Sequence, residues 1–434
     1  MKTFKTIASL LVGTVSSLLL MGCGEIDTGT ETSAWEKETA TIVPEEPKTE
    51  IILGDIGRAS TLQEAVADFN SKNDGITITI HDYYEENIND GISRLYDDIL
   101  TGKGPDIISF STDEMDVEVL REKGAIENLI PYLEKSDVIG EEDIVDSAYH
   151  VLTADGGLYM LPTNFALYTL ITKEKWCSNK ENFTFEEALR AVRECEEDPM
   201  ISRDLFLQEG AICGGYSGET EDNRLEQYIK IAEQLPQQAM FQTNDLLMRE
   251  GKIPFNLECI GDMQQYLYKK SVWGEDAVYT GFPGAEGNGR IFIFVNCFAI
   301  NSQSTHKEEA WKFVESYFTE EGQKTIAPNW NFSILQDVLD QQLSDSRKQE
   351  YYQTSDGKRE KLPILTYEIG GTYENVYAAQ DEDIQDVREM INKKEAHQMP
   401  RSISPMVCAI MLMPSENRLS PKGCTNADTI RRVR

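Results

Sequence analysis

The chain has few positive charges for its size. Its 434 residues include 41 Lys and Arg against 75 Asp and Glu, which gives a formal net charge of −34. A surface of this kind repels nucleic acid and anionic lipid, so we expect no nucleic-acid partner. Hydrophobic residues make up 40% of the chain, enough for globular packing, and its length indicates two lobes or domains rather than one core.

The sequence also lacks the common motifs of catalysis and metal binding. It contains no G-x-S-x-G, H-E-x-x-H, P-loop, EF-hand or C-x-x-C pattern, and its four histidines are scattered. The eight cysteines are irregularly spaced, so we expect most of them to be buried thiols. We predict a protein that is not an enzyme and that has no cofactor and no metal site. A glycoside hydrolase remains an alternative, because its two acids leave no sequence motif.

No apolar run near the N-terminus is long enough to span a membrane. The run from Ile7 to Met21 is shorter than the roughly 20 residues required, and it follows a short basic start. These features predict a signal peptide over residues 1–22. The sequence Leu20-Met21-Gly22-Cys23 resembles the bacterial lipobox, which implies a diacylglycerol and palmitate-type chains on Cys23. A plain signal peptide with an incidental cysteine is the alternative.

Lipidation of Cys23 would hold the protein on the extracytoplasmic face of the cell membrane, because two or three buried acyl chains anchor stably. Residues 23–49 are rich in Thr, Glu, Lys and Pro and poor in apolar residues. Such a segment cannot bury enough surface to fold. We therefore predict a disordered tether there, between the membrane and a folded body.

The folded body begins with a β-α-β-α-β pattern. Short apolar strands at residues 51–53, 76–80 and 107–110 alternate with helical periodicity at residues 62–69 and 92–100. This order predicts an α/β fold with a parallel sheet. Ligands in such sheets lie beyond the carboxyl ends of the strands, which nominates the loops at 54–60 and 111–115. Ordinary turns, in which Asp55 and Ser60 only cap helices, are the alternative.

The rest of the body mixes helices with long apolar strands. Pro162 interrupts a β-rich run and predicts a break in that strand. Capping boxes predict helix starts at Thr184 and Thr305. We expect residues 205–275 to be mainly helical, residues 291–300 to form a strand and residues 367–391 to be helical.

Several segments in this order resemble the family 1 extracellular solute-binding proteins of ABC sugar importers, the group that contains maltodextrin-binding protein. The matching text includes LQEAVADFNSKN, ILTGKGPDIISF, GGLYMLPTNFALYTLITKEKW and FAINSQSTHKEEAWKFVESYFTEEGQ. The resemblance implies a two-lobed, type II periplasmic-binding-protein fold with hinge-crossing strands. Lobe one would comprise residues 50–162 and 284–318, and lobe two residues 163–283 and 319–397. The first crossing would fall near Leu161 and Pro162.

The resemblance also implies a function. The protein would be a monomer that captures a carbohydrate between its lobes and delivers it to the transmembrane subunits of an ABC permease. The family's contacts with the ligand fall on Asp55, Ser111, Asp113, Asn164, Tyr168, Glu258, Asp262, Arg290, Asn296, Tyr367 and Tyr373. The tryptophan expected near Gly261 is missing, which argues against maltodextrin as the cargo. The same fold with a peptide or polyamine cargo, or a surface glycosidase, are the alternatives.

The C-terminal residues 398–434 differ from the rest of the chain. They contain six Lys and Arg residues and two acids, a net charge of +4 in an otherwise acidic protein. Helical periodicity stops near Ala396, whereas the family ends in amphipathic helices. This atypical tail suggests a frameshifted or misassembled C-terminus; a genuine basic appendage is the alternative.

Overall fold

The computed structural model describes most of the body of the protein. Every described residue belongs to one compact unit, residues 47–434. The predictions for the signal peptide, Cys23, nearly all of the tether and all of the tail after Gln398 lie outside the described residues. The description covers residues 48–57, 62–84, 88–153, 156–180, 182–197, 201–213, 224–237, 245–284, 290–319, 321–323, 331–392 and 396–398.

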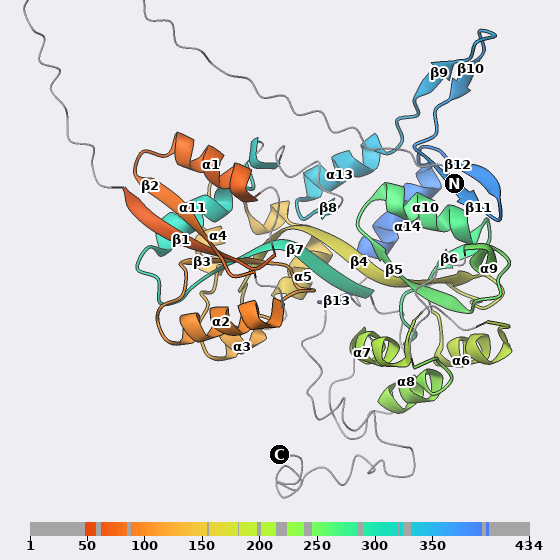
Figure 1. Ribbon diagram of the computed structural model, residues 1–434, viewed down its shortest axis with the longest axis horizontal. Helices are drawn as coiled ribbons and strands as arrows, with labels where there is room; N and C mark the ends of the chain where they lie inside the picture. Colours follow the sequence, from red (N-terminus) through yellow and green to blue (C-terminus); the bar gives the residue numbers. More distant parts are fainter. Residues whose placement is uncertain are drawn as a thin grey trace, which may run out of the picture. The chain divides into compact units, whose positions relative to one another are not determined.

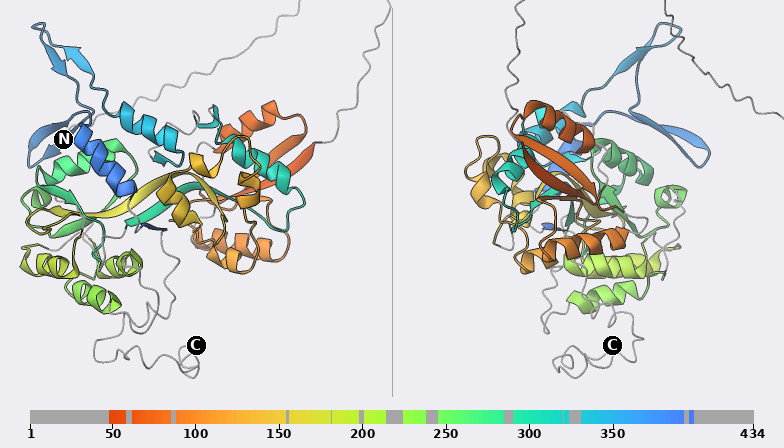
Figure 2. Two further views of the ribbon diagram at one scale, coloured as in Figure 1. Left: turned by 180° about the vertical axis from the view of Figure 1, so that it is seen from behind. Right: turned by 60° about the vertical axis from the view of Figure 1, so that its left-hand side comes forward.

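The predicted β-α-β-α-β pattern is confirmed. Strand β1 (Thr49–Asp55) pairs in parallel with both β2 (Ile76–Asp82) and β3 (Ile107–Phe110). Helices α1 (Leu62–Lys72) and α2 (Ile88–Leu100) lie on opposite faces of these strands (Figures 1 and 2). Alternating isoleucine and leucine side chains of the strands are buried against them, which explains the apolar alternation in the sequence.

Two long strands continue this sheet into the second half of the body. Strand β7 (Arg290–Ile300) pairs antiparallel with β3, and also with β4 (Leu161–Lys173) from Phe298 to Ile291. The predicted break at Pro162 falls at the second residue of β4, and the strand continues unbroken to Lys173. The described sheet has nine strands, with the order β2-β1-β3-β7-β4-β5 and three further strands beside β4 and β7.

The second half surrounds the far end of β4. Strand β5 (Phe255–Ile260) pairs antiparallel with β4, and so do β6 (Ala277–Tyr279) and β8 (Phe332–Ser333); β13 (Ala396–Gln398) pairs with β7. Helices α10 (Met263–Trp273) and α14 (Asp381–Ile391) cover one side of β4 and β5 (Figure 1). The other side carries α6 (Phe185–Glu194), α7 (Arg203–Cys213) and α8 (Arg224–Ala232). Within residues 205–275, the mainly helical prediction is right for the described parts except β5, a short buried strand without strict alternation; residues 214–223 and 238–244 lie outside the description.

Two hairpins follow the sheet: β9 (Tyr351–Gln353) with β10 (Arg359–Lys361), and β11 (Leu365–Ile369) with β12 (Thr372–Val376). The helical prediction is therefore wrong for residues 367–376 and right for α14. Its error has a local cause, because Gly370 and Gly371 both have positive φ and form the two-residue turn typical of a β-hairpin.

The remaining helices are short or lie at the edges of the sheet. They are α3 (Glu118–Glu122), α4 (Ile130–Leu133), the 3-10 helix η1 (Glu141–Asp143), α5 (Asp146–Leu152), α9 (Asp245–Arg249), α11 (Lys307–Ser316) and α13 (Gln336–Asp345). The capping box of Thr184 with Glu187 is confirmed. The box predicted at Thr305 is wrong, because His306 precedes α11 and makes no side-chain cap.

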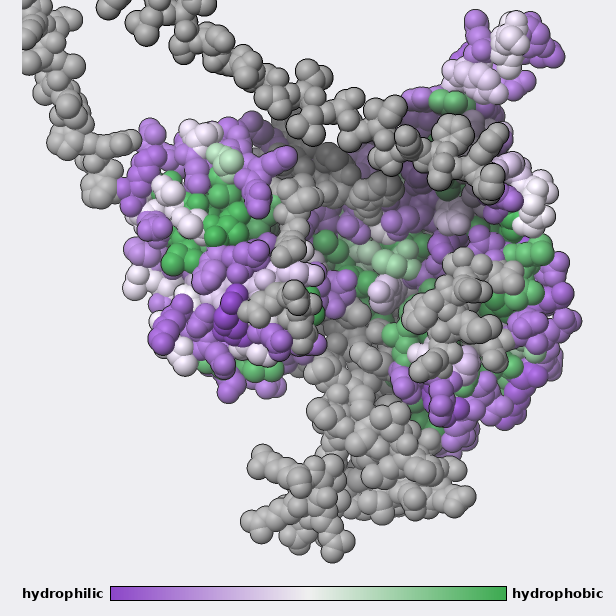
Figure 3. Space-filling model, in the orientation of Figure 1, coloured by the Kyte–Doolittle hydropathy of each residue, from purple (hydrophilic) through white to green (hydrophobic). Residues whose placement is uncertain are grey.

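The visible surface of the described body is mainly hydrophilic, in keeping with the acidic composition (Figure 3). Among the described residues, none of the helices combines the length and the apolar character needed to cross a lipid bilayer.

Candidate functional site

Strands β1 and β3 end at the same edge of the sheet. Asp55, the last residue of β1, is in register with Ser109 of β3, and the Ile56 amide donates to the Ser109 carbonyl at 3.1 Å. The loop that begins at Ser111 follows β3 directly, and the Asp55 side chain is only 6% exposed. Two of the predicted contact residues, Asp55 and Ser111, therefore lie at the edge where α/β sheets bind ligands.

Two further acids occupy the same edge. Asp113 and Glu114 follow Ser111, whose carbonyl accepts a hydrogen bond from the Glu114 amide at 3.0 Å. The Glu114 carboxylate lies against Gly57, where a Cβ atom would be 2.7 Å from Glu114 Oε2. Desolvation, and then the charges of Asp113 and Asp55, raise the pKa of Glu114; desolvation also raises the pKa of Asp113, although its side chain is partly exposed.

The raised pKa of Glu114 has a consequence for stability. Between the ordinary pKa near 4.5 and the raised pKa, the folded state binds more protons than the unfolded state, so stability falls as pH rises through this window. We expect Glu114→Gln to raise the free energy of unfolding at pH 7 by at most about 1 kcal/mol and to flatten its pH dependence. Urea unfolding between pH 4 and 7 measures both effects. Asp137→Asn, at an exposed position, is the control, and an equal change there would contradict the prediction.

The crossing strand β7 binds this acidic loop directly. The Thr112 amide donates to the Phe294 carbonyl, and the Phe294 amide donates to Thr112 Oγ1, both at 2.9 Å. Between Phe294 and Cys297, which pairs with Phe110, β7 has one more residue than the chain opposite it, which is the geometry of a β-bulge. Asn296 has a φ of +50°, the only positive φ of a residue other than glycine in the described chain. The bulge lies opposite the acidic loop after β3, while β7 stays paired with β4 on both sides of it.

Asparagine is one of the few residue types besides glycine that adopt the left-handed backbone conformation found at position 296. Replacing it with valine should destabilise the protein by about 1–2 kcal/mol, because a β-branched residue is strained in the left-handed region. Asn296→Gly relieves that strain and should stay within about 1 kcal/mol of the natural protein. Denaturant unfolding of both variants checks this order. Equal loss in the valine and glycine variants would show that the Asn296 side chain, and not its backbone conformation, matters.

Residues of β4 and β5, in the second half of the body, approach the same edge of the sheet as Asp55 and Asp113. Asn164 of β4 pairs with Val295, and its side chain accepts a hydrogen bond from Thr163 at 2.9 Å. Cys259 of β5 is opposite Tyr168 of β4. Protein atoms desolvate its partly exposed thiol and, together with the charges of Asp113 and Glu258, raise its pKa to about 11. Asp113, from the first half, therefore lies close enough to β5 to act on its side chains.

Asp262 follows β5 at the end that faces the crossing, because Ile260 pairs with Leu167 of β4. Its carboxylate caps α10 and accepts from the Gln265 amide at 2.7 Å. Burial still raises the pKa of Asp262. Asp262 therefore caps α10 at the end of β5 that faces the crossing, and its contact with the ligand stays a prediction.

Three predicted contacts lie in other surroundings. Glu258 is buried, with an ion pair to Lys269 Nζ at 2.8 Å and a hydrogen bond from Asn256. The Tyr367 hydroxyl accepts from Arg249 at 2.9 Å and donates to Glu374, away from the crossing strands. Tyr373, on the same hairpin, is 74% exposed. The side chain of Arg290, the first residue of β7, lies outside the described part, so all these contacts stay predictions.

The sequence prediction missed two side chains of this site. Glu114 lies within the nominated loop, but Asp113 was named there instead. Tyr317 follows α11; it is buried, its hydroxyl has no hydrogen-bond partner among the described residues, and burial together with the charge of Asp55 raises its pKa. The position of Glu114 in the nominated loop could have identified it as a site residue. No local sequence pattern predicts that Tyr317 lies near Asp55.

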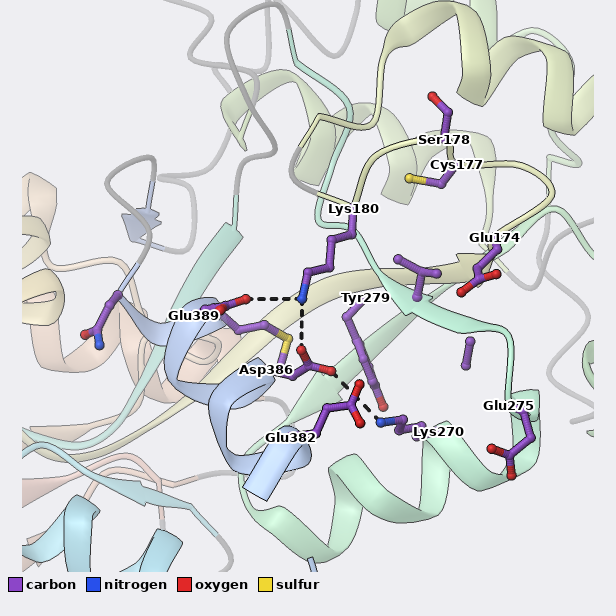
Figure 4. Close-up of a pocket in the computed structure, with 14 residues that line it drawn as sticks. Glu174, Cys177, Ser178, Lys180, Lys270, Glu275, Tyr279, Glu382, Asp386 and Glu389 are labelled. Carbon is purple, nitrogen blue, oxygen red and sulfur yellow. Dashed lines mark hydrogen bonds and ion pairs between the residues drawn. The ribbon is translucent and has the colours of Figure 1, made fainter. Parts of the chain in front are cut away.

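A separate pocket lies in the second half. This α14 pocket, of about 700 Å³, is lined by residues of the loop after β4, of β6 and of helices α10 and α14. Lys180 forms ion pairs there with Asp386 at 2.9 Å and Glu389 at 3.2 Å (Figure 4). None of the eleven predicted ligand contacts lines the α14 pocket. Its labelled lining residues are Glu174, Cys177, Ser178, Lys180, Lys270, Glu275, Tyr279, Glu382, Asp386 and Glu389.

Metal and disulfide chemistry has no visible site in the described chain. No group of three or more His, Cys, Asp or Glu side chains there could hold a metal ion. Cys195, Cys259 and Cys297 are free thiols.

The comparisons with known proteins identify the family. The model of the bacterial extracellular solute-binding proteins matches residues 64–343, more than half of the chain. The chain belongs to this family, as the resemblance of its sequence segments predicted. No curated protein sequence matches the chain.

Solved structures agree on the fold. The sugar-binding protein MalE from Xanthomonas citri has a TM-score of 0.53 and 14% identity, over 84% of this chain and 89% of that one. A family 1 extracellular solute-binding protein from Bifidobacterium longum subsp. infantis has a TM-score of 0.53 and 17% identity, over 86% and 96%. A family 1 protein from Alicyclobacillus acidocaldarius reaches 0.51 and 16%, over 84% and 92%. The predicted α/β solute-binding fold with crossing strands is thereby confirmed.

Proposed function

We propose that this protein is the lipid-anchored substrate-binding subunit of an ABC importer. It captures a carbohydrate between two lobes, acts as a monomer without catalysis or a cofactor, and delivers the cargo unaltered to the transmembrane subunits of a permease. The observation that carries the proposal is the convergence at the crossing strands. Asp55, Asp113 and Glu114 come from the first half, and the charge of Asp113 acts on Cys259, which is paired with Tyr168 in the second.

The chemistry of these side chains suits a sugar. A sugar ring has apolar C–H faces and a rim of hydroxyls, which tyrosine rings and carboxylate or amide oxygens bind respectively. The similarity to a sugar-binding protein of the same fold supports this cargo. A ligand that contacts loops of both halves stabilises the arrangement in which the two halves are closed around it. Candidate contacts on both halves therefore support capture between two lobes.

A thermal-shift screen tests the cargo. A ligand raises stability by RT ln(1 + [L]/Kd), about 2.7 kcal/mol at a hundred times Kd, so one sugar should raise the melting temperature by several degrees. Asp113→Ala should remove most of that shift, whereas Asp137→Asn should retain it. Chromatography of the released ligand should recover the sugar intact. If no mono- or oligosaccharide shifts the melting temperature, the carbohydrate assignment fails; if the sugar is cleaved, a surface glycosidase replaces it.

A cationic solute is the second candidate. Asp55, Asp113 and Glu114 are close enough to raise the pKa of Glu114, and an ammonium group would relieve that repulsion. A polyamine or a basic peptide in the same screen tests this candidate. A shift with such a solute, and none with sugars, would keep the fold and the transport role but change the cargo.

The membrane anchor is tested separately. We expect the protein in the producing bacterium to fractionate with membranes and to carry acyl chains on Cys23, detected by mass spectrometry of the N-terminal peptide. Cys23→Ser should move it to the soluble fraction with its ligand affinity unchanged. Membrane association that survives Cys23→Ser would refute the lipid anchor.

A further inference from the structure

The α14 pocket carries negative charge that the described residues do not neutralise. Its lining has five carboxylates and two lysines, a net charge of −3. Both lysines are already engaged: Lys180 with Asp386 and Glu389, and Lys270 with Asp383 at 2.8 Å. The side chains of Glu174, Glu275 and Glu382 form no ion pair or hydrogen bond with any described residue. The pocket therefore favours a cationic occupant.

The chain itself contains a cationic segment that can reach this pocket. Residues 399–434 have six Lys and Arg residues and two acids, the one strongly basic stretch of a chain with net charge −34. The segment follows Gln398, which pairs with Phe292 of β7, and Phe292 in turn pairs with Leu167 of β4.

The distance from that point to the pocket is short. Tyr279, a lining residue, pairs with Ile171 of β4, four residues beyond Leu167, which is about 13 Å along the strand. The two strand spacings from β13 to β4 add about 10 Å. A segment of 36 residues can extend to about 120 Å, so its basic residues reach the pocket without strain.

We propose that the α14 pocket binds the basic C-terminal segment of the same chain, residues 399–434. Lys and Arg side chains of this segment pair with Glu174, Glu275 and Glu382, and the pocket holds the segment against the second half of the body. The site is separate from the residues at the crossing strands and does not depend on which solute they bind.

Photocrosslinking of the full-length protein tests the occupant. A p-benzoylphenylalanine introduced in place of Glu275 should crosslink to tryptic peptides from residues 399–434 within one molecule. The same probe in place of Glu64, on the exposed face of α1, should not. Crosslinks only to other segments would overturn the proposal, and a crosslinked dimer would assign the pocket to a second copy. An intact mass that lacks residues 399–434 would also overturn it.

Protection from trypsin provides a second measurement. The neutralised variant Glu174→Gln, Glu275→Gln, Glu382→Gln should be cleaved after Arg418 and Lys422 about tenfold faster than the natural protein, because it loses the ion pairs that hold the segment in the pocket. The control Glu64→Gln, Asp90→Asn, Asp137→Asn removes the same charge from exposed positions elsewhere and should not change the rate. Equal rates in all three proteins would overturn the proposal. An added polyamine that releases the segment would support it.

Discussion

Replacing Lys269 with methionine is expected to lower the free energy of unfolding by about 3 kcal/mol. The Glu258 side chain is 5% exposed, and Lys269 Nζ, 2.8 Å away, is its only cation among the described residues. The variant leaves a buried carboxylate with the Asn256 amide as its remaining described partner, and that amide cannot replace a charge. Urea unfolding at pH 7 measures the loss.

Two comparisons make this result specific. The double variant Glu258→Gln, Lys269→Met removes both charges and should recover most of the stability, because the unpaired charge is the main cost. Lys348→Met breaks an ion pair with Asp345 in which the lysine is 72% exposed, and should cost less than about 0.5 kcal/mol. If Lys269→Met costs no more than Lys348→Met, Glu258 is not held mainly by this ion pair. That result would favour the prediction that Glu258 contacts the ligand.

Replacing Phe165 with alanine is expected to cost about 4 kcal/mol. Phe165 lies in β4 at the crossing; it is fully buried, and its ring centroid lies 5.1 Å from that of Phe292 and 5.7 Å from that of Phe332. These three rings join β4, β7 and β8, so the alanine variant leaves a cavity beneath the strands that connect the two halves. The midpoint of urea unfolding should fall without a change in the solute that binds.

Two further variants distinguish the stability lost with core packing from the effect of merely removing an aromatic ring. Phe165→Leu keeps most of the volume and should cost no more than about 1.5 kcal/mol. Tyr373→Ala removes a ring that is 74% exposed and should leave stability nearly unchanged. A loss below about 1 kcal/mol for Phe165→Ala would mean that the crossing repacks and that the three rings do not join the strands.

The local sequence was sufficient for most of the fold. The short apolar run in β1, the alternating isoleucines in β2, the helical periodicity in α1 and α2, and the Thr184 capping box each act within a few residues, so their patterns predicted the elements correctly. The helical prediction for residues 367–376 failed because the turn at Gly370 and Gly371 was not recognised.

The sequence was likewise sufficient for one part of the candidate site and not for the rest. Chain position placed Asp55, Ser111 and Asp113 at the ends of parallel strands, because strand order and the right-handed crossover bring those ends together. The sequence also indicated the family, through several short segments in a fixed order.

The tertiary structure alone decided which of the other polar residues join them. Glu258 pairs with Lys269 of the next element, α10, and Tyr367 pairs with Glu374 of its own hairpin and with Arg249, 118 residues away in the sequence, because packing between elements brings these side chains together. Tyr317 approaches Asp55, and Asp113 approaches Cys259, for the same reason. A residue type predicts what a side chain is able to bind, but long-range packing decides which partner reaches it first.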